Sequence, residues 1–198
     1  MKYTILLLFV TIQLFAQKPA ALPRSTPEAE GVSSEGILNF LEAAAKSNHE
    51  FHSFMVVRHG KVVAEGWWNP YRSDLKHTMY SCSKSFAATA VGFAVAEKKL
   101  TVEDKVIAFF PEDLPATMPP FLAELRIKDL LSMSVGHEKD PTSKVSAREA
   151  DWVKAFFAIP IVHQPGTKFL YNSAATFMLS AIVQKVTGQK IVDYLNPR

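Results

Sequence analysis

The chain has 198 residues, of which 48% are hydrophobic and 21% are charged, and this composition is typical of a globular protein. It excludes a disordered or fibrous chain. Lysine and arginine outnumber aspartate and glutamate by only 22 to 19, and no basic run is long enough to indicate a nucleic-acid-binding surface. We therefore predict no nucleic-acid partner, and the charge balance identifies no other partner.

The N-terminus has the layout of a secretory signal peptide. Lys2 supplies a positive charge, residues 5–15 are apolar but for two positions, and Ala16 provides a small residue at a cleavage site. The apolar stretch is shorter than the roughly 20 residues that span a bilayer. We predict a signal peptide over residues 1–16, cleavage near Ala16, export to the periplasm or the medium, and no membrane span after its removal.

Residues 17–32 are rich in Pro, Ala and Glu and are interpreted as a leader into the fold. The domain itself is predicted over residues 33–198. It begins with a helix, because Ser33 or Ser34 can cap a segment whose apolar residues recur on one helical face. Those apolar residues are Ile37, Leu41, Ala44 and Ala45.

A β-hairpin is predicted next. Residues 54–58 and 61–65 are strand-like, and the His59-Gly60 pair between them is typical of a two-residue turn. Residues 67–80 have the composition of a loop, and their aromatic side chains can pack over the end of the hairpin.

The remainder is mostly helical. An apolar helix from Ser81 to about Lys98 is expected to be central and buried, because apolar residues cover most of its circumference. Residues 137–148 are polar and are interpreted as an exposed loop. The other predicted helices cover residues 127–134, 152–157 and 174–186, the last closed by Gly188.

The sequence gives little indication of a metal site or of a disulfide. Cys82 is the only cysteine, so no internal disulfide can form, and we interpret it as a small buried residue at the head of an apolar helix. His49 and His52 have a spacing that could hold a metal, but no cysteine or carboxylate cluster accompanies them. We predict no metal and no cofactor.

The pattern Ser81-Cys82-Ser83-Lys84 carries the clearest chemistry. Residues three apart on a helix are neighbours, so Lys84 can reach the Ser81 hydroxyl. The helix N-terminus favours negative charge that develops nearby, and a partly desolvated lysine can serve as a base. Ser81 as an N-cap with a solvated Lys84 is the alternative, and the loop pattern Ser73 to Lys76 shows that the motif alone is weak.

The surrounding sequence resembles the serine beta-lactamase and penicillin-binding superfamily, especially class C-like beta-lactamases, DD-peptidases and esterases. Three segments fall in that family's order: residues 80–106, which hold the nucleophile helix; residues 126–136, a leucine-pair helix that ends in Ser-x-Gly; and residues 165–188, the tyrosine motif with its helix. The resemblance implies an α+β fold of the beta-lactamase/transpeptidase type, with an N-terminal helix and β-hairpin beside a mostly helical domain.

The resemblance also implies roles for individual residues. Ser81 would be the acylated nucleophile, Lys84 and Tyr171 would share proton transfer, and the Ser81 amide would form half of an oxyanion hole. A phenol whose unperturbed pKa is about 10 can act as a base only if cationic neighbours such as Lys84 lower that pKa. A second tyrosine, Tyr194, fits the motif literally but lacks the preceding Pro-Gly turn, so we reject it.

The sequence departs from the family pattern at two places. The family has Asn at the third position of the tyrosine motif, where this chain has Ser173, with Asn172 one residue earlier. Both are candidates for substrate binding, and an N-cap of the following helix is the alternative for either. No Lys- or His-x-Gly strand follows Tyr171, so we interpret the chain as a fragment whose last sheet strands are missing and whose own activity is low.

Two functional classes follow from the resemblance. The first is an exported serine hydrolase that forms an acyl-enzyme on an amide or ester, with a small-molecule or peptidoglycan-like substrate. The second is a non-catalytic, penicillin-binding-like sensor or binding module. A Ser-His-Asp hydrolase is set aside because G-x-S-x-G is absent, and the oligomeric state stays open.

Overall fold

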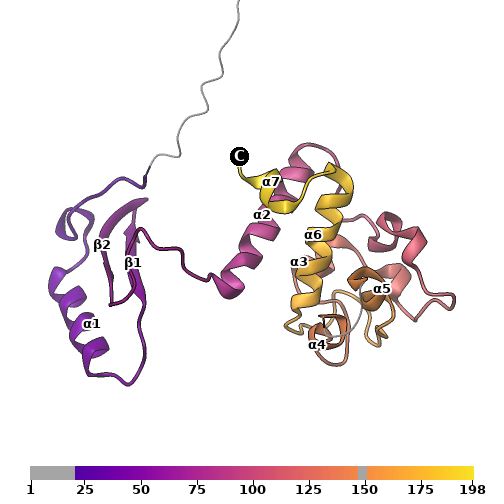
Figure 1. The fold of residues 1–198 in the computed structure, drawn as a ribbon, viewed down its shortest axis with the longest axis horizontal. Helices are drawn as coiled ribbons and strands as arrows, with labels where there is room; N and C mark the ends of the chain where they lie inside the picture. Colours follow the sequence, from indigo (N-terminus) through magenta and orange to yellow (C-terminus); the bar gives the residue numbers. More distant parts are fainter. Residues whose placement is uncertain (1–20, 147–150) are drawn as a thin grey trace, which may run out of the picture. The chain divides into compact units, whose positions relative to one another are not determined.

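A computed structural model describes residues 21–146 and 151–198 (Figure 1). They form two compact units, of which the first ends at Thr78 and the second runs from Met79 to Arg198. The predicted signal peptide and the first four residues of the predicted leader lie outside the described residues. Among the described residues, none of the helices combines the length and apolarity needed to cross a bilayer.

The first unit opens with a short 3-10 helix, η1 (Glu28–Glu30), and the helix α1 (Ser34–Lys46). Ser33 is the N-cap of α1, since its hydroxyl accepts the Gly36 amide at 3.1 Å, as its sequence position predicts. The predicted leader contributes to the fold: the Val62 amide donates to the Pro23 carbonyl at 2.8 Å.

The hairpin of strands β1 (Ser53–Arg58) and β2 (Lys61–Trp67) confirms the sequence prediction. The strands are antiparallel, with a bulge between Val56 and Val57. Its turn residues His59 and Gly60 both have positive φ, 49° and 74°, as a two-residue hairpin turn requires. Compared with the predicted ranges, β1 begins one residue earlier and β2 ends two residues later.

Aromatic side chains cover the hairpin. Phe54 of β1 lies 5.6 Å from Phe40 of α1 and 5.7 Å from Trp68, measured between ring centroids. Tyr71 stacks on His52 at 3.9 Å. The packing role predicted for the aromatic residues after the hairpin is therefore confirmed at Trp68 and Tyr71.

The second unit is helical. Its central helix is α2 (Ser83–Ala96), preceded by the 3-10 turn η2 (Tyr80–Cys82), and the helix that packs along it is α6 (Ser173–Thr187). Gly188 ends α6 in the left-handed conformation, as predicted. The other elements are η3 (Val106–Phe109), η4 (Pro111–Asp113), η5 (Leu122–Glu124), α3 (Ile127–Leu131), α4 (Thr142–Ser146), α5 (Trp152–Phe157) and α7 (Ile191–Leu195).

The core of this unit lies where α2, α3 and α6 meet. Ala90 and Ala94 of α2 and Ala175 of α6 are completely buried, and α2 packs along α6. Larger apolar residues surround this contact, among them Leu125, Ile127, Leu130, Phe156, Phe157, Met178 and Ile182.

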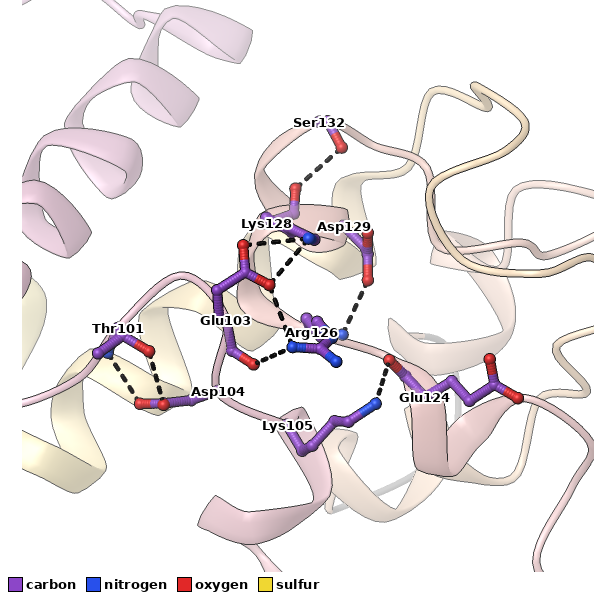
Figure 2. A network of polar contacts seen from close by, with 9 residues as sticks. All are labelled: Thr101, Glu103, Asp104, Lys105, Glu124, Arg126, Lys128, Asp129 and Ser132. Atoms are coloured by element: carbon purple, nitrogen blue, oxygen red, sulfur yellow. Dashed lines mark hydrogen bonds and ion pairs between the residues drawn. The ribbon is translucent and has the colours of Figure 1, made fainter.

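A polar network fixes the start of α3 (Figure 2). Glu103 accepts from Lys128 Nζ at 2.8 Å and from Arg126 Nη1 at 3.1 Å, so one carboxylate ties the loop after α2 to α3. Asp129 is buried and accepts the Arg126 amide at 2.9 Å, which satisfies a backbone donor at the N-terminus of α3. The network thus sets the position of the segment that follows α3.

Three predictions need correction. Over its described part, residues 137–146, the predicted exposed loop is partly buried: His137 is buried, and α4 forms around a buried Val145, because these side chains complete the core under α5 and α6. Residues 147 and 148 of that prediction lie outside the described residues. The helix α2 is not buried all round, since within its unit only one side is covered and Phe86 stays half exposed. The helix predicted to reach Ser134 ends at Leu131, because Met133 adopts a left-handed φ of 54°.

Candidate active site

The N-terminus of α2 has an unusual backbone. Tyr80, directly before Ser81, has a φ of 44°. A residue other than glycine adopts such a backbone conformation only at a cost of about 1 kcal/mol or more. The Tyr80 ring is 78% exposed, so burial of that ring does not explain the conformation. The Ser83 hydroxyl donates to the Tyr80 carbonyl at 2.6 Å and holds the turn. Strain of this kind clusters at functional sites.

Ser81 and Lys84 face each other on successive turns. Ser81 lies in the 3-10 turn η2, where side chains three residues apart eclipse one another, and Lys84 is in the first turn of α2. The Lys84 ammonium donates to Ser81 Oγ at 3.1 Å. Ser81 is exposed, whereas Lys84 is half-buried, so the Ser81 hydroxyl is accessible from the solvent.

Tyr171 lies just before α6 and contacts Ser81. The chain before it turns at Gly166, whose φ of 87° suits glycine, and two backbone hydrogen bonds hold it against the segment after α3. The Gly166 amide donates to the Ser134 carbonyl at 2.8 Å, and the Leu170 amide donates to the Met133 carbonyl at 2.9 Å. The next residue, Tyr171, is thereby directed towards the N-terminus of α2.

The three side chains meet. The Tyr171 hydroxyl lies 2.6 Å from Ser81 Oγ, and Lys84 Nζ lies 5.0 Å from the centre of the Tyr171 ring. The hydrogen bond with Ser81 lowers the pKa of the Tyr171 phenol below 10.0, and the neighbouring Lys84 ammonium lowers it further. An electrophile placed at Ser81 Oγ would therefore meet a nucleophile, a proton acceptor and a cation within one site.

The two substrate-binding candidates differ in their surroundings. Asn172 is 1% exposed and is the N-cap of α6: its Oδ1 accepts the Ala175 amide at 3.0 Å, and its Nδ2 lies 3.1 Å from His137 Nδ1. The N-cap alternative therefore describes Asn172, whose polar atoms are already used inside the protein. Ser173 is half-buried at the first position of α6, beside Tyr171.

An open groove begins beside the site. It has a volume of about 830 Å³ and runs between α2, α6 and α7. Lys84 and Ser173 are among its lining residues, and so are the apolar side chains of Phe86, Phe93 and Val192. Ser173 therefore stays a candidate for substrate contact, while Asn172 has no access to the groove surface.

Three other residues considered in the sequence analysis lie away from the contact between Ser81, Lys84 and Tyr171 or differ in burial from the prediction. Cys82 is exposed rather than buried, because η2 turns its side chain away from the core of the unit. Tyr194, the rejected tyrosine, is 1% exposed and belongs to the core. His52 contacts His77 at 2.6 Å between Nδ1 and Nε2, within the first unit. The residues described contain no group of three metal-ligating side chains.

Sequence reasoning missed His137, whose Nδ1 lies 3.1 Å from Nδ2 of Asn172. Its neighbours Glu138, Lys139 and Asp140 are charged, and a single polar residue beside them gives no sign of burial. Only the pairing of segments distant in the sequence places His137 inside the unit.

The sequence profile of the Beta-lactamase family matches residues 44–198. The chain belongs to the beta-lactamase family. It is 24% identical over 227 residues to an Escherichia coli (strain K12) protein with the provisional name D-alanyl-D-alanine carboxypeptidase, covering 98% of this chain and 52% of that protein. It is also 28% identical over 159 residues to the 6-aminohexanoate-dimer hydrolase of Paenarthrobacter ureafaciens, covering 73% and 40% of the two chains.

The family and the solved structures agree on the fold. The crystal structure of a beta-lactamase/D-alanine carboxypeptidase from Pseudomonas syringae matches 82% of this chain and 46% of that one with a TM-score of 0.66 at 20% identity. The α+β, beta-lactamase-like fold predicted from the sequence is confirmed, and the family is one of serine hydrolases. The chain spans about half the length of the curated relatives it matches.

Proposed function

We propose that Ser81 is the nucleophile of an acyl-enzyme hydrolase, with Tyr171 as the general base and Lys84 as the cation that tunes it. The single observation that carries this proposal is the 2.6 Å contact between Ser81 Oγ and the Tyr171 hydroxyl, with Lys84 Nζ 3.1 Å from the same oxygen. These distances are within the range for direct proton transfer between a nucleophile and its base.

The chemistry runs in two halves. In the first, the Tyr171 phenolate takes the Ser81 proton, Oγ bonds to the substrate carbonyl carbon, and Tyr171 returns the proton to the departing nitrogen or oxygen. This breaks the amide or ester bond and leaves Ser81 acylated. In the second, Tyr171 takes a proton from water, the hydroxide attacks the acyl carbon, and the Ser81 oxygen leaves with the proton.

The oxyanion of each tetrahedral intermediate needs donors. The resemblance implies that the Ser81 amide, at the positive end of the α2 dipole, provides one. It implies a second donor, beside a Lys- or His-x-Gly strand. Loss of one oxyanion donor costs a serine hydrolase about 10²–10³ in rate.

The substrate class follows from the family and the groove. Two relatives carry the names D-alanyl-D-alanine carboxypeptidase, given provisionally, and 6-aminohexanoate-dimer hydrolase. We propose an amide or ester with an acyl group that lies in the apolar groove beside Lys84, such as a β-lactam, a peptidoglycan-like peptide or a simple ester. A penicillin-binding sensor is the second candidate, because Ser173 replaces the amide side chain that the family has at this position.

Export to the periplasm or the medium is part of the proposal. It depends on the signal-peptide layout of residues 1–16 and the expected cleavage near Ala16. Expression of the chain in a Gram-negative host, followed by N-terminal sequencing of the periplasmic fraction, tests it. A product that begins near Gln17 supports export, and retention in the cytoplasm with an intact N-terminus contradicts it.

Hydrolysis of an activated aryl ester and of a chromogenic β-lactam tests the catalytic proposal. We expect a first-turnover release of product that the Ser81→Ala substitution abolishes. Ser73→Ala is the matched control, because Ser73 belongs to the loop with the same four-residue pattern and should leave the release unchanged. Equal release by native and Ser81→Ala proteins would contradict the proposal, and a stable acyl adduct without turnover would favour the sensor.

A further inference from the structure

A buried histidine lies behind the tyrosine motif. His137 and Asn172 are each 1% exposed, and His137 Nδ1 lies 3.1 Å from Asn172 Nδ2. Asn172 Oδ1 accepts the Ala175 amide at 3.0 Å, so the side-chain amide links His137 to the first turn of α6. The mechanism uses neither residue, although Asn172 directly follows Tyr171 in the chain.

The direction of the hydrogen bond between His137 and Asn172 follows from its partners. Because Asn172 Oδ1 is occupied by a backbone donor, the amide nitrogen must face His137 and donate to it. His137 Nδ1 is therefore the acceptor, and the proton of the neutral ring is on Nε2. A protonated ring would set two donors against each other and break the contact.

The surroundings keep the ring neutral. Burial lowers the pKa of His137 from 6.5 to about 4, although the Asp140 carboxylate acts in the opposite direction. The ring packs edge-on against Phe156 at 5.3 Å, and among the described residues its Nε2 has no hydrogen-bond partner. Near pH 7 the His137 ring is therefore neutral and retains its acceptor.

The backbone of residues 133–137 holds the chain that precedes Tyr171. The Met133 carbonyl accepts the Leu170 amide at 2.9 Å, and the Gly136 carbonyl accepts the amides of Val162 and His163, both at 3.0 Å. His137 itself pairs with Ile161 in an isolated antiparallel bridge. Residues 133–137 thus fix Leu170 before Tyr171 through the backbone and Asn172 after it through a side chain.

We propose that His137 is a positioning residue for Tyr171: its neutral Nδ1 holds Asn172, and this contact keeps the Tyr171 hydroxyl at Ser81 Oγ. The inference rests on the proposed role of Tyr171 as the general base. It assigns no contact with substrate to His137, which acts through Asn172 alone.

The test follows the titration of the Tyr171 phenol by NMR of the full chain labelled with ¹³C-tyrosine, with Tyr171→Phe identifying the signal. His137→Leu removes the acceptor, whereas His137→Asn can place an oxygen near the position of Nδ1. We expect the Tyr171 pKa to rise towards 10.0 in His137→Leu and to stay as in the native chain in His137→Asn. An unchanged Tyr171 pKa in His137→Leu would overturn the inference.

A second variant covers the case in which His137→Leu does not fold. Asn172→Ser retains an N-cap for α6 but cannot reach His137, so it should raise the Tyr171 pKa in the same way. If either substitution lowers thermal stability while the Tyr171 titration stays in place, His137 has only a packing role and the inference is wrong.

The measurement also separates this inference from the proposed function, because the titration needs no reaction at Ser81. If Ser81 is never acylated while the Tyr171 pKa responds to His137→Leu, the proposed function fails and the positioning role stands. If Ser81 is acylated and the Tyr171 pKa does not respond, the proposed function stands and the positioning role fails.

Discussion

The hydroxyls of Ser81 and Tyr171, 90 residues apart in the chain, lie 2.6 Å from each other. Packing of α2 on α6 brings them together, because Ser81 precedes α2 and Tyr171 precedes α6. The proposed chemistry therefore depends on the N-terminal ends of two helices that share one core, and substitutions can test its parts separately.

Tyr171→Phe removes the proposed base and leaves the fold intact. The ring is 45% exposed and its hydroxyl contacts Ser81, so we expect little change in thermal stability. The rate of Ser81 acylation should fall by about 10²–10⁴-fold, the usual contribution of a general base. Single-turnover kinetics with an activated aryl ester measure it. A rate within twofold of the native value would show that the phenol is not the base.

Lys84→Met should shift the pH dependence of the same reaction. The base form of Tyr171 is the phenolate, which is populated above the pKa, so a lowered pKa lets acylation begin at lower pH. Without Lys84 the pKa should rise, and the ascending limb of the pH–rate profile should move to higher pH. Lys76→Met, in the loop with the similar pattern, is the control. Superimposable profiles for Lys84→Met and the native chain would contradict this role.

The parts of the fold that depend on local sequence signals, such as helix caps and turns, could be predicted from the sequence. The Ser33 cap, the His59-Gly60 turn and the Gly188 end of α6 lie where their chemistry requires. The prediction of an exposed loop was wrong at His137 and α4, because their burial depends on contacts with residues 161–174, far along the chain. Asn172 was ambiguous for the same reason, since its amide partner His137 lies 35 residues away.

Glu30 gives a pH-dependent prediction for the first unit. Its carboxylate accepts from Lys61 Nζ at 2.6 Å and lies 3.2 Å from His59 Nδ1. The hydrogen bond from Lys61, followed by one from Ser25, lowers the Glu30 pKa from 4.5 to about 2. A lowered folded-state pKa contributes stability that is present above pH 4.5 and is lost as pH falls towards 2.

Thermal unfolding of the native chain and of Glu30→Gln should therefore differ most near pH 7, with the native chain more stable. The difference should shrink as pH falls from about 4.5 to about 2. Glu42→Gln is the control, because the Glu42 side chain is 68% exposed and its ion pair with Lys46, at 3.6 Å, lies on the surface. A Glu30→Gln difference that stays constant over this pH range would show that the carboxylate charge does not stabilise the unit.

Replacing glycine by alanine should change the stability of the second unit in opposite directions at Gly136 and Gly92. A Cβ at Gly136 would collide with the His163 carbonyl oxygen, and its φ of 96° disfavours other residues. We expect Gly136→Ala to destabilise the second unit by about 2 kcal/mol or more. Gly92 lies within α2 with open space around it, so Gly92→Ala should stabilise by about 0.5–1 kcal/mol.

Urea unfolding of both glycine variants measures these free energies. Equal stability of Gly136→Ala and the native chain would mean that the segment 133–137 does not lie against residues 161–170 as described. Gly136→Ala should also slow acylation of Ser81, because the same contacts hold Tyr171, whereas Gly92→Ala should not.

The central claim is that Ser81 is the nucleophile, and covalent labelling tests it most directly. The chain is incubated with a fluorophosphonate, and the adduct is located by intact-mass and peptide mass spectrometry. We predict one adduct per chain on the peptide that contains Ser81, slower labelling in Tyr171→Phe and none in Ser81→Ala. An adduct on another residue, or equal labelling of Ser81→Ala, would contradict the account.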